Sequence, residues 1–225
     1  MWSTLSGVAP ANAADPCVAP VMNQVACENT LTGTPESTWQ VQSPSPNIVG
    51  FTTATSANVG TLLGFKVKTP STSYRIDIYR LGWYAGNGAR LVTSLAPSVP
   101  LPQTQPACLN QNTTTGLIDC GNWAVSALWN IPATAVSGEY LADLERLDGA
   151  ATGQGNQIPF IVRDDSSHSG LLFQASDTTW QAYNSYGGNS LYGGTAPAGR
   201  AYKVSFNRPY ENVGADNAYS NAEYP

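Results

Sequence analysis

Residues 61–95 have the sequence TLLGFKVKTPSTSYRIDIYRLGWYAGNGARLVTSL. Apolar and polar side chains alternate in two runs, around Phe65 and around Ile76, and turn-forming residues follow each run. Such alternation predicts strands that bury one face. Similar patterns predict further strands near residues 48–55, 89–95, 123–131, 138–147 and 158–162. We therefore expect about eight strands in an Ig-like antiparallel β-sandwich that spans residues 15–163.

Two of these elements can be specified further. The strand before Pro132 is expected to present four side chains on one face: Trp123, Val125, Ala127 and Trp129. Residues 81–89 predict a hairpin whose Trp83 and Tyr84 pack on the sandwich, with positive φ angles at residues 86–88. The alternative is that the two aromatic side chains are exposed and bind a ligand.

The composition excludes several classes of protein. Only 11% of the 225 residues are charged, against about 25% in a typical soluble domain. That excludes a coiled coil, a helical bundle or a solvated tail. A net charge of −5 argues against a nucleic-acid partner, and without an 18-residue apolar run we expect no membrane span.

The N-terminus and the cysteines indicate a secreted or otherwise extracytoplasmic protein. Ala-Asn-Ala at residues 11–13 fits a signal-peptidase site, so residues 1–14 are interpreted as the remnant of a signal peptide. A disordered N-terminus that happens to contain this tripeptide is the alternative. Local disulfides are expected because each cysteine pair brackets a short loop: Cys17–Cys27 and Cys108–Cys120. The only histidine, His168, lies in a polar loop and is expected to be solvated.

The texture of the sequence changes after residue 163. Residues 164–170 are charged and Ser-rich and predict a linker. A short apolar run over 171–175 predicts a buried parallel strand, and Ser176 or Asp177 is expected to cap a helix over 178–184. Alternation over 201–206 predicts another strand. Residues 171–225 are therefore expected to begin an α/β domain.

Tyrosines concentrate in this second region. Seven of the 11 lie there: Tyr183, Tyr186, Tyr192, Tyr202, Tyr210, Tyr219 and Tyr224. Tyrosines in Gly- and Asn-rich loops pack, stack on sugars or bases, or ligate a hard metal ion. A phenol with its ordinary pKa near 10 is a poor ligand unless an ion such as ferric iron displaces the proton. The residues alone leave the three uses open.

Four motifs resemble one known family. They are IYRLGWYAGNGARLV (78–92), TTWQAYNSYGGNSLY (178–192), SFNRPY (205–210) and NAEYP (221–225). In this order they resemble secreted bacterial proteins of the N,N-dimethylformamidase large-subunit (beta-subunit) family. The resemblance implies a β-sandwich followed by a class I glutamine amidotransferase-like α/β domain, and an amide hydrolase that has a second, small subunit.

The resemblance also implies a metal site. Characterised members bind one iron ion through two tyrosines and one glutamate, and the iron polarises an amide carbonyl and activates water. The first tyrosine corresponds to Tyr183 and the second to Tyr192 or Tyr186. The family's glutamate lies in a motif like H-[D/P]-E-Y-W-S downstream of NAEYP, and Glu223 does not match it. We therefore expect the catalytic domain to be incomplete here and the chain as given to be inactive.

Two functions follow for testing. The first is hydrolysis of the C–N bond of a small amide at a tyrosine-ligated iron. The second is a non-catalytic, exported binding module for a polysaccharide or a cell-surface partner. It would use two exposed aromatic side chains of the sandwich, Trp83 and Tyr84, together with the tyrosine-rich C-terminal region. A homo-oligomer or a complex with another subunit is compatible with either function.

Overall fold

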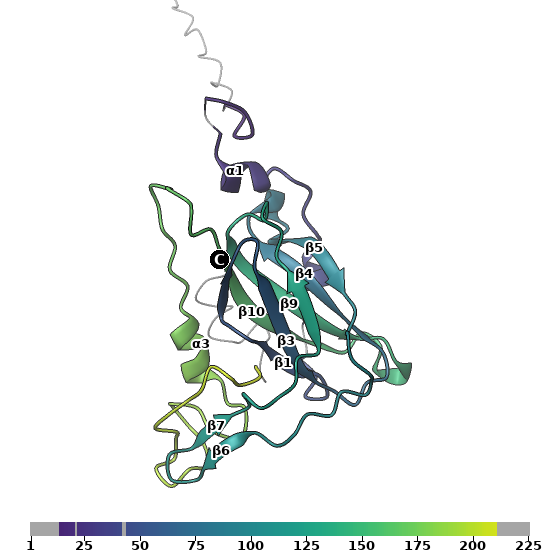
Figure 1. Ribbon diagram of the computed structural model, residues 1–225, viewed down its shortest axis with the longest axis vertical. Coiled ribbons are helices and arrows are strands. Elements are labelled where there is room, and N and C mark those ends of the chain that lie inside the picture. Colours follow the sequence, from purple (N-terminus) through teal and green to yellow (C-terminus); the bar gives the residue numbers. More distant parts are fainter. Residues whose placement is uncertain (1–13, 21, 42–43, 211–225) are drawn as a thin grey trace, which may run out of the picture.

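The computed structural model describes residues 14–20, 22–41 and 44–210, and they form a mainly β molecule (Figure 1). A five-stranded sheet has the order β2-β10-β9-β4-β5. Its strands are β2 (Ser56–Asn58), β4 (Tyr74–Leu81), β5 (Ala89–Leu95), β9 (Gly138–Arg146) and β10 (Gly155–Arg163). All its pairings are antiparallel except that of β2 with β10, which is parallel.

A second sheet and a hairpin complete the β structure. The three-stranded sheet has the order β1-β3-β8, and both of its pairings are antiparallel. Its strands are β1 (Val49–Thr52), β3 (Leu62–Lys68) and β8 (Ala127–Asn130). The separate hairpin consists of β6 (Leu109–Asn112) and β7 (Leu117–Asp119).

The helical elements are all short. They are α1 (Gln24–Glu28), α2 (Glu36–Trp39) and α3 (Asp177–Tyr183), with 3-10 turns at Tyr84–Gly86 and Gly149–Ala151. No helix within the described part of the chain is long and apolar enough to cross a membrane. The scarcity of helix agrees with the near absence of 3.6-residue periodicity in the sequence.

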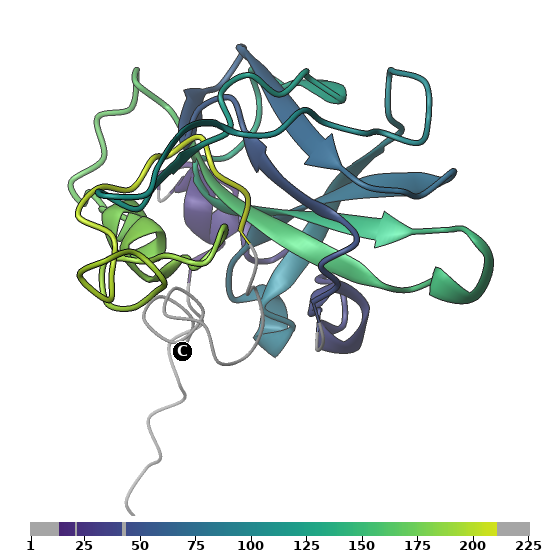
Figure 2. The same ribbon diagram turned by 90° about the horizontal axis from the view of Figure 1, so that it is seen from below.

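The alternating residues form the core because each strand turns every second side chain toward the other sheet. Phe65 of β3 and Phe160 of β10 meet edge to face, with ring centroids 5.8 Å apart, and Trp129 of β8 lies 6.0 Å from Phe160. The two sheets therefore enclose one hydrophobic cluster (Figure 2). The predictions of strands at 48–55, 89–95, 138–147 and 158–162 are confirmed in outline.

The prediction for residues 123–129 was partly wrong. Strand β8 begins only at Ala127, and Trp123 lies outside it. Trp129 joins the main core, whereas Trp123 packs in a second cluster with Phe51, at 5.7 Å between ring centroids. The alternation was present, but the chain turns before β8, so these side chains do not share one face.

The hairpin prediction was right for Tyr84 and wrong for Trp83. Tyr84 is fully buried, and its hydroxyl donates to Glu28 Oε1 (2.9 Å) and accepts from Arg80 Nη1 (3.0 Å). Trp83 is 71% exposed. Positive φ angles occur at Tyr84 (38°) and Ala85 (56°) and at two glycines, Gly86 and Gly88, but not at Asn87.

Two strand predictions in the C-terminal half were wrong. Residues 171–175 form no strand, and Leu171, Leu172 and Phe173 are largely exposed, Leu172 by 95%. Residues 201–206 are irregular as well. Among the described residues, no strand pairs with either segment. An apolar or alternating sequence forms a strand only where such a partner is present. The helix prediction is confirmed by α3, which follows Ser176 and has Asp177 in its first turn.

Both predicted disulfides are present, Cys17–Cys27 beside α1 and Cys108–Cys120 beside the β6–β7 hairpin. In Figure 1 they lie at opposite ends of the molecule, since α1 is at the top and the hairpin at the bottom. Residues 1–13, interpreted above as a signal-peptide remnant, lie outside the described residues.

Candidate functional site

The described part of the tyrosine-rich region lies at the lower end of the molecule in Figure 1. We call α3 and the segment from it to residue 210 the tyrosine layer. In Figures 1 and 2, α3 and the segment up to residue 210 lie beside the β6–β7 hairpin. Tyr202 N donates to Thr115 O (2.8 Å) and Cys120 N to Asn207 O (2.6 Å), which ties the layer to the hairpin. Any site built from these tyrosines is therefore hydrogen-bonded to the β6–β7 hairpin.

Two of the three candidate ligand tyrosines meet in space. The rings of Tyr183, the last residue of α3, and Tyr192 are stacked, with centroids 4.4 Å apart and planes inclined by 27°. Both side chains are exposed, by 53% and 66%. The structure thus presents two phenols side by side at the surface.

The third candidate, Tyr186, lies elsewhere. Its ring meets Trp123 edge to face, at 6.3 Å between centroids, and it packs on the second hydrophobic cluster. Its backbone N donates to Asn184 Oδ1 (3.1 Å), which turns the chain just after α3. The residues that follow Tyr183 therefore direct Tyr186 inward and away from the stacked pair.

A tight loop holds Tyr192. Asn189 and Gly194 form an isolated antiparallel bridge, and Ser190 N donates to Gly193 O (2.8 Å). The hydroxyl of Ser190 also accepts from Tyr192 N (3.2 Å). Gly194 has a φ of 153°, and a Cβ there would come within 2.6 Å of Gly188 O, so only glycine fits this turn.

The loop and α3 are joined directly. Leu191 N donates to Ala182 O (2.9 Å), so the residues that precede Tyr192 and Tyr183 are hydrogen-bonded to each other. The buried guanidinium of Arg208 makes further bonds to both segments: Nη2 donates to Gln181 O and Nη1 to Asn189 O, each at 2.8 Å.

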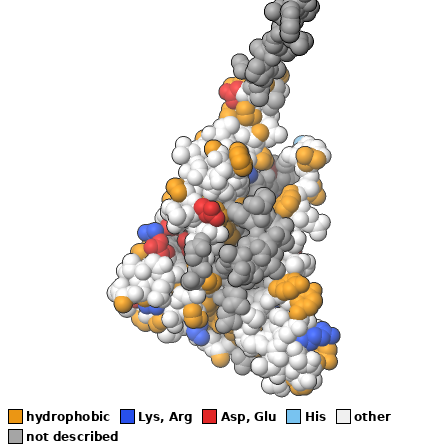
Figure 3. Space-filling view, turned by 180° about the vertical axis from the view of Figure 1, so that it is seen from behind, with side chains coloured by type: hydrophobic (Ala, Val, Ile, Leu, Met, Phe, Trp, Pro, Cys, Tyr) orange, Lys and Arg blue, Asp and Glu red, His pale blue; other side chains and the backbone are white. Residues whose placement is uncertain are grey.

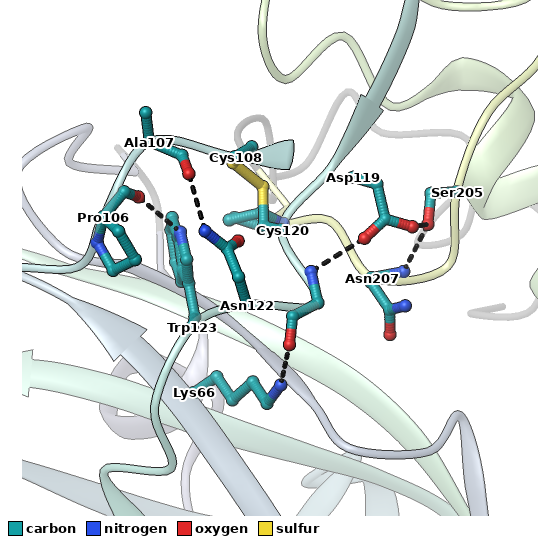
Figure 4. The surroundings of a disulfide bond; sticks show 12 residues. Lys66, Pro106, Ala107, Cys108, Asp119, Cys120, Asn122, Trp123, Ser205 and Asn207 are labelled. Carbon is teal, nitrogen blue, oxygen red and sulfur yellow. Dashed lines mark hydrogen bonds between the residues drawn. A yellow bond between two sulfur atoms is a disulfide. The ribbon is translucent and has the colours of Figure 1, made fainter. Parts of the chain in front are cut away.

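The disulfide-linked hairpin contacts the layer through Asp119 (Figure 4). Asp119, at the end of β7, accepts from Ser205 Oγ through Oδ2 (2.6 Å) and from Gly121 N through Oδ1 (2.8 Å). Partial burial raises the pKa of Asp119, but these hydrogen bonds outweigh it and hold the pKa below its ordinary value. Asp119 is therefore a charged anchor for the segment around Ser205.

Another tyrosine of the region, Tyr210, serves packing. Its ring joins the main hydrophobic cluster, and its hydroxyl accepts from Gln181 Nε2 (2.8 Å). Burial raises the pKa of Tyr210, although the hydrogen bond from Gln181 opposes this. Its position in the core and its bond to Gln181 are those of a packing residue.

Residues 171–206 include large apolar and aromatic side chains that are exposed. They are Leu171, Leu172, Phe173, Tyr183, Tyr192, Tyr202 and Phe206. The guanidinium of Arg200 lies over the Tyr202 ring, 5.1 Å from its centroid. On the face seen in Figure 3, charged side chains are few and scattered among apolar and uncharged polar ones.

The donor set fits part of a ferric site. Two adjacent phenols are hard oxygen donors of the kind that a highly charged ion prefers. Within the described ranges, no cluster of three His, Cys, Asp or Glu side chains could hold a metal ion by itself. Glu223, Tyr219 and Tyr224 lie outside those ranges. His168 is exposed, as expected for a solvated loop histidine.

The sequence analysis gave no role to two residues of this region. Asn189 closes the Tyr192 loop, with Oδ1 accepting from Ala196 N (2.8 Å), and Arg208 joins the loop to α3. Arg208 lies within the SFNRPY motif, which was the available signal. Its acceptors are backbone carbonyls, which every residue has. The sequence therefore could not indicate which residues Arg208 would bind.

The fold and the site define a class before any comparison is made: a disulfide-linked two-sheet β protein with a surface layer that presents paired tyrosines. The chain belongs to the N,N-dimethylformamidase beta subunit-like, C-terminal family, whose model matches residues 75–225. The resemblance found in the sequence motifs is thereby confirmed. No curated protein matches the chain.

Proposed function

We propose that this protein is the tyrosine-bearing part of a dimethylformamidase-like amide hydrolase, and that Tyr183 and Tyr192 bind its iron ion. The stacked arrangement of these two exposed rings is the observation that carries the proposal. It favours Tyr192 over Tyr186 as the second ligand, because Tyr186 packs against Trp123. The family match to residues 75–225 covers both tyrosines.

The residues have separate tasks in this proposal. Tyr183 and Tyr192 hold the ion through their phenolic oxygens, on two segments that hydrogen bonds keep together. When bound, iron supplies Lewis acidity that polarises an amide carbonyl and lowers the pKa of water. The exposed rings of the pair would themselves offer apolar contacts to the alkyl groups of a small amide. The glutamate ligand that the resemblance implies would come from polypeptide outside the described residues.

Titration of the protein with ferric iron tests the proposal. We expect a visible phenolate-to-iron absorption band that Tyr183→Phe and Tyr192→Phe each abolish or strongly weaken. Tyr202→Phe is the matched control, because Tyr202 is exposed in the same layer but lies outside the stack. A band that survives both substitutions, or that Tyr202→Phe abolishes instead, would refute the assignment of the ligands.

We also propose the finer features of fold and location. The two-sheet body would be an Ig-like sandwich, and residues from 171 onward would begin a class I glutamine amidotransferase-like domain, as the family resemblance implies. Secretion is supported by the two disulfides, which persist in oxidising compartments. A small amide substrate, and either a second subunit or a homo-oligomer, complete the proposal.

The alternative function, a non-catalytic binding module for a polysaccharide or surface partner, stays a prediction. Of the two sandwich side chains expected to bind such a ligand, Tyr84 is buried and Trp83 is exposed. A glycan array with wild-type protein and Trp83→Ala would detect such binding and locate it.

A further inference from the structure

We infer that Arg208 is a positioning residue that sets the relative placement of Tyr183 and Tyr192 by joining the two segments that carry them. This inference rests on the proposed function only in giving the stacked pair a purpose. The geometry of the clamp itself involves no metal ion and can be tested without one.

Arg208 forms hydrogen bonds to both of the segments that carry the stacked tyrosines. Its side chain is 0% exposed, and its two terminal nitrogens donate to carbonyls of different segments. Nη2 binds Gln181 O in α3, two positions before Tyr183, and Nη1 binds Asn189 O in the loop, three positions before Tyr192. One rigid, planar group therefore fixes the distance between the two segments.

Arg208 is itself held in place from both sides. Asn207 O accepts from Cys120 N (2.6 Å), which ties the residue before Arg208 to the disulfide-linked hairpin. Pro209 O accepts from Asn184 Nδ2 (2.8 Å), which ties the residue after it to the end of α3. Arg208 therefore acts from a fixed position.

The chemistry of arginine fits this role. Burying a guanidinium costs desolvation free energy unless its N–H groups are hydrogen-bonded. An arginine that served only to fill space in the core would therefore destabilise the fold. The guanidinium carries donors that diverge in one plane and can reach two carbonyls at once. A lysine ammonium is a compact point donor on a flexible stem, so it cannot hold both carbonyls in the same geometry.

Photochemical cross-linking provides a readout that needs no iron. A ruthenium photosensitiser, with persulfate as the electron acceptor, oxidises tyrosines by one electron each. Two adjacent tyrosyl radicals then couple to dityrosine, which peptide mass spectrometry locates. We expect a Tyr183–Tyr192 cross-link in the wild-type protein, because the ring centroids are 4.4 Å apart. Arg208→Lys should lower its yield by about tenfold, since displacements near 1 Å have effects of that order or more on geometry-dependent reactions.

Arg163→Lys is the matched control, because Arg163 is exposed at the end of β10 and its side chain bonds to Asp165 and Ser56 and not to either tyrosine segment. It should leave the yield unchanged, whereas Tyr192→Phe should abolish the cross-link. The variants are compared at a temperature at which circular dichroism shows each to be folded. If folded Arg208→Lys gives the wild-type yield, Arg208 is merely structural and the inference is overturned.

A second measurement covers the case in which Arg208→Lys does not fold. In the wild-type protein, the Leu191 amide, which donates to Ala182 O, should be strongly protected from hydrogen exchange. Rapid exchange there would show that the segments are not held together, and would overturn the inference. If the cross-link depends on Arg208 but the iron band survives Tyr183→Phe and Tyr192→Phe, the proposed function is refuted and the clamp is not. If the iron band depends on both tyrosines but the cross-link does not depend on Arg208, the clamp is refuted and the proposed function is not.

Discussion

At the residue scale, the most unusual group of the β body is Asp143. It lies directly opposite Asp77 in the β4–β9 pairing, and both are nearly inaccessible to solvent. Asp77 accepts from Arg75 Nε (2.7 Å) and Ser94 Oγ (2.5 Å), whereas no donor among the described residues reaches Asp143 Oδ1. Burial raises the pKa of Asp143 well above its ordinary value. Glu145 and Asp77 add to the rise and Arg75 opposes it.

This arrangement predicts a pH-dependent stability. Because the pKa of Asp143 is raised in the folded state, the unfolded chain loses its proton first, and stability falls as pH rises above about 4 toward the folded-state pKa. Asp143→Asn should remove that loss and be more stable than the wild type at pH 8 by about 1–3 kcal/mol. Urea unfolding at pH 4.5 and pH 8 measures the difference.

Asp77→Asn is the control for this prediction. It weakens the acceptor for Arg75 and Ser94 and should destabilise the protein at both pH values. Equal pH slopes for the wild type and Asp143→Asn would show that Asp143 is ionised in the folded protein and would contradict the prediction.

At the element scale, the β6–β7 hairpin positions the tyrosine layer. The Cys108–Cys120 disulfide closes it, and Asp119 and Cys120 make hydrogen bonds to Ser205 and Asn207. The hairpin also fits closely against the Gly-rich loop: a Cβ on Gly187 would lie 2.7 Å from Ile118. A loose hairpin would therefore loosen the segments that carry the stacked rings.

Replacing both cysteines tests this dependence. Cys108→Ala/Cys120→Ala should lower the free energy of unfolding by about 3 kcal/mol, the size expected for a loop of this length. It should also lower the yield of the Tyr183–Tyr192 cross-link. The control is Cys17→Ala/Cys27→Ala, whose disulfide lies at the other end of the molecule (Figure 1). An equal loss of cross-link in both variants would mean that the hairpin has no special role.

At the scale of the whole molecule, the tyrosine layer and the two sheets share one core. Trp180 of α3 and Tyr210 both belong to the main hydrophobic cluster. Asn156 Nδ2 of β10 donates to Tyr210 O (3.1 Å), and Tyr210 N donates to Gly50 O of β1 (3.3 Å). These contacts imply that the described residues unfold together. The division into domains at residues 164–170 stays a prediction.

Two tryptophan substitutions test this cooperativity. Trp180→Ala should destabilise the entire protein by about 3–5 kcal/mol, because a large buried side chain leaves a cavity, and unfolding should remain a single transition. Trp83→Ala should change stability by no more than about 0.5 kcal/mol, because Trp83 is exposed. Separate transitions for the tyrosine layer and the sheets, by fluorescence and circular dichroism, would contradict a shared core.

The sequence by itself determined most strands of the two sheets, the disulfides and the family. Strand patterns such as that of Ile76 and Ile78 are local, because side chains alternate at every second residue whatever the distant contacts. The cysteine pairs bracket short loops, so their proximity is also local. The motifs that carry the family resemblance are contiguous, and the family model matches the region that contains them.

Only the tertiary structure decided which side chains meet. Tyr186 is closer in sequence to Tyr183 than Tyr192 is, yet the turn after α3 sends it to Trp123. Alternation in residues 201–206 produced no strand because a ladder requires a partner, and none of the described residues supplies one. The clamp of Arg208 depends on two backbone carbonyls that every sequence possesses, and only folding brings them within reach of one guanidinium.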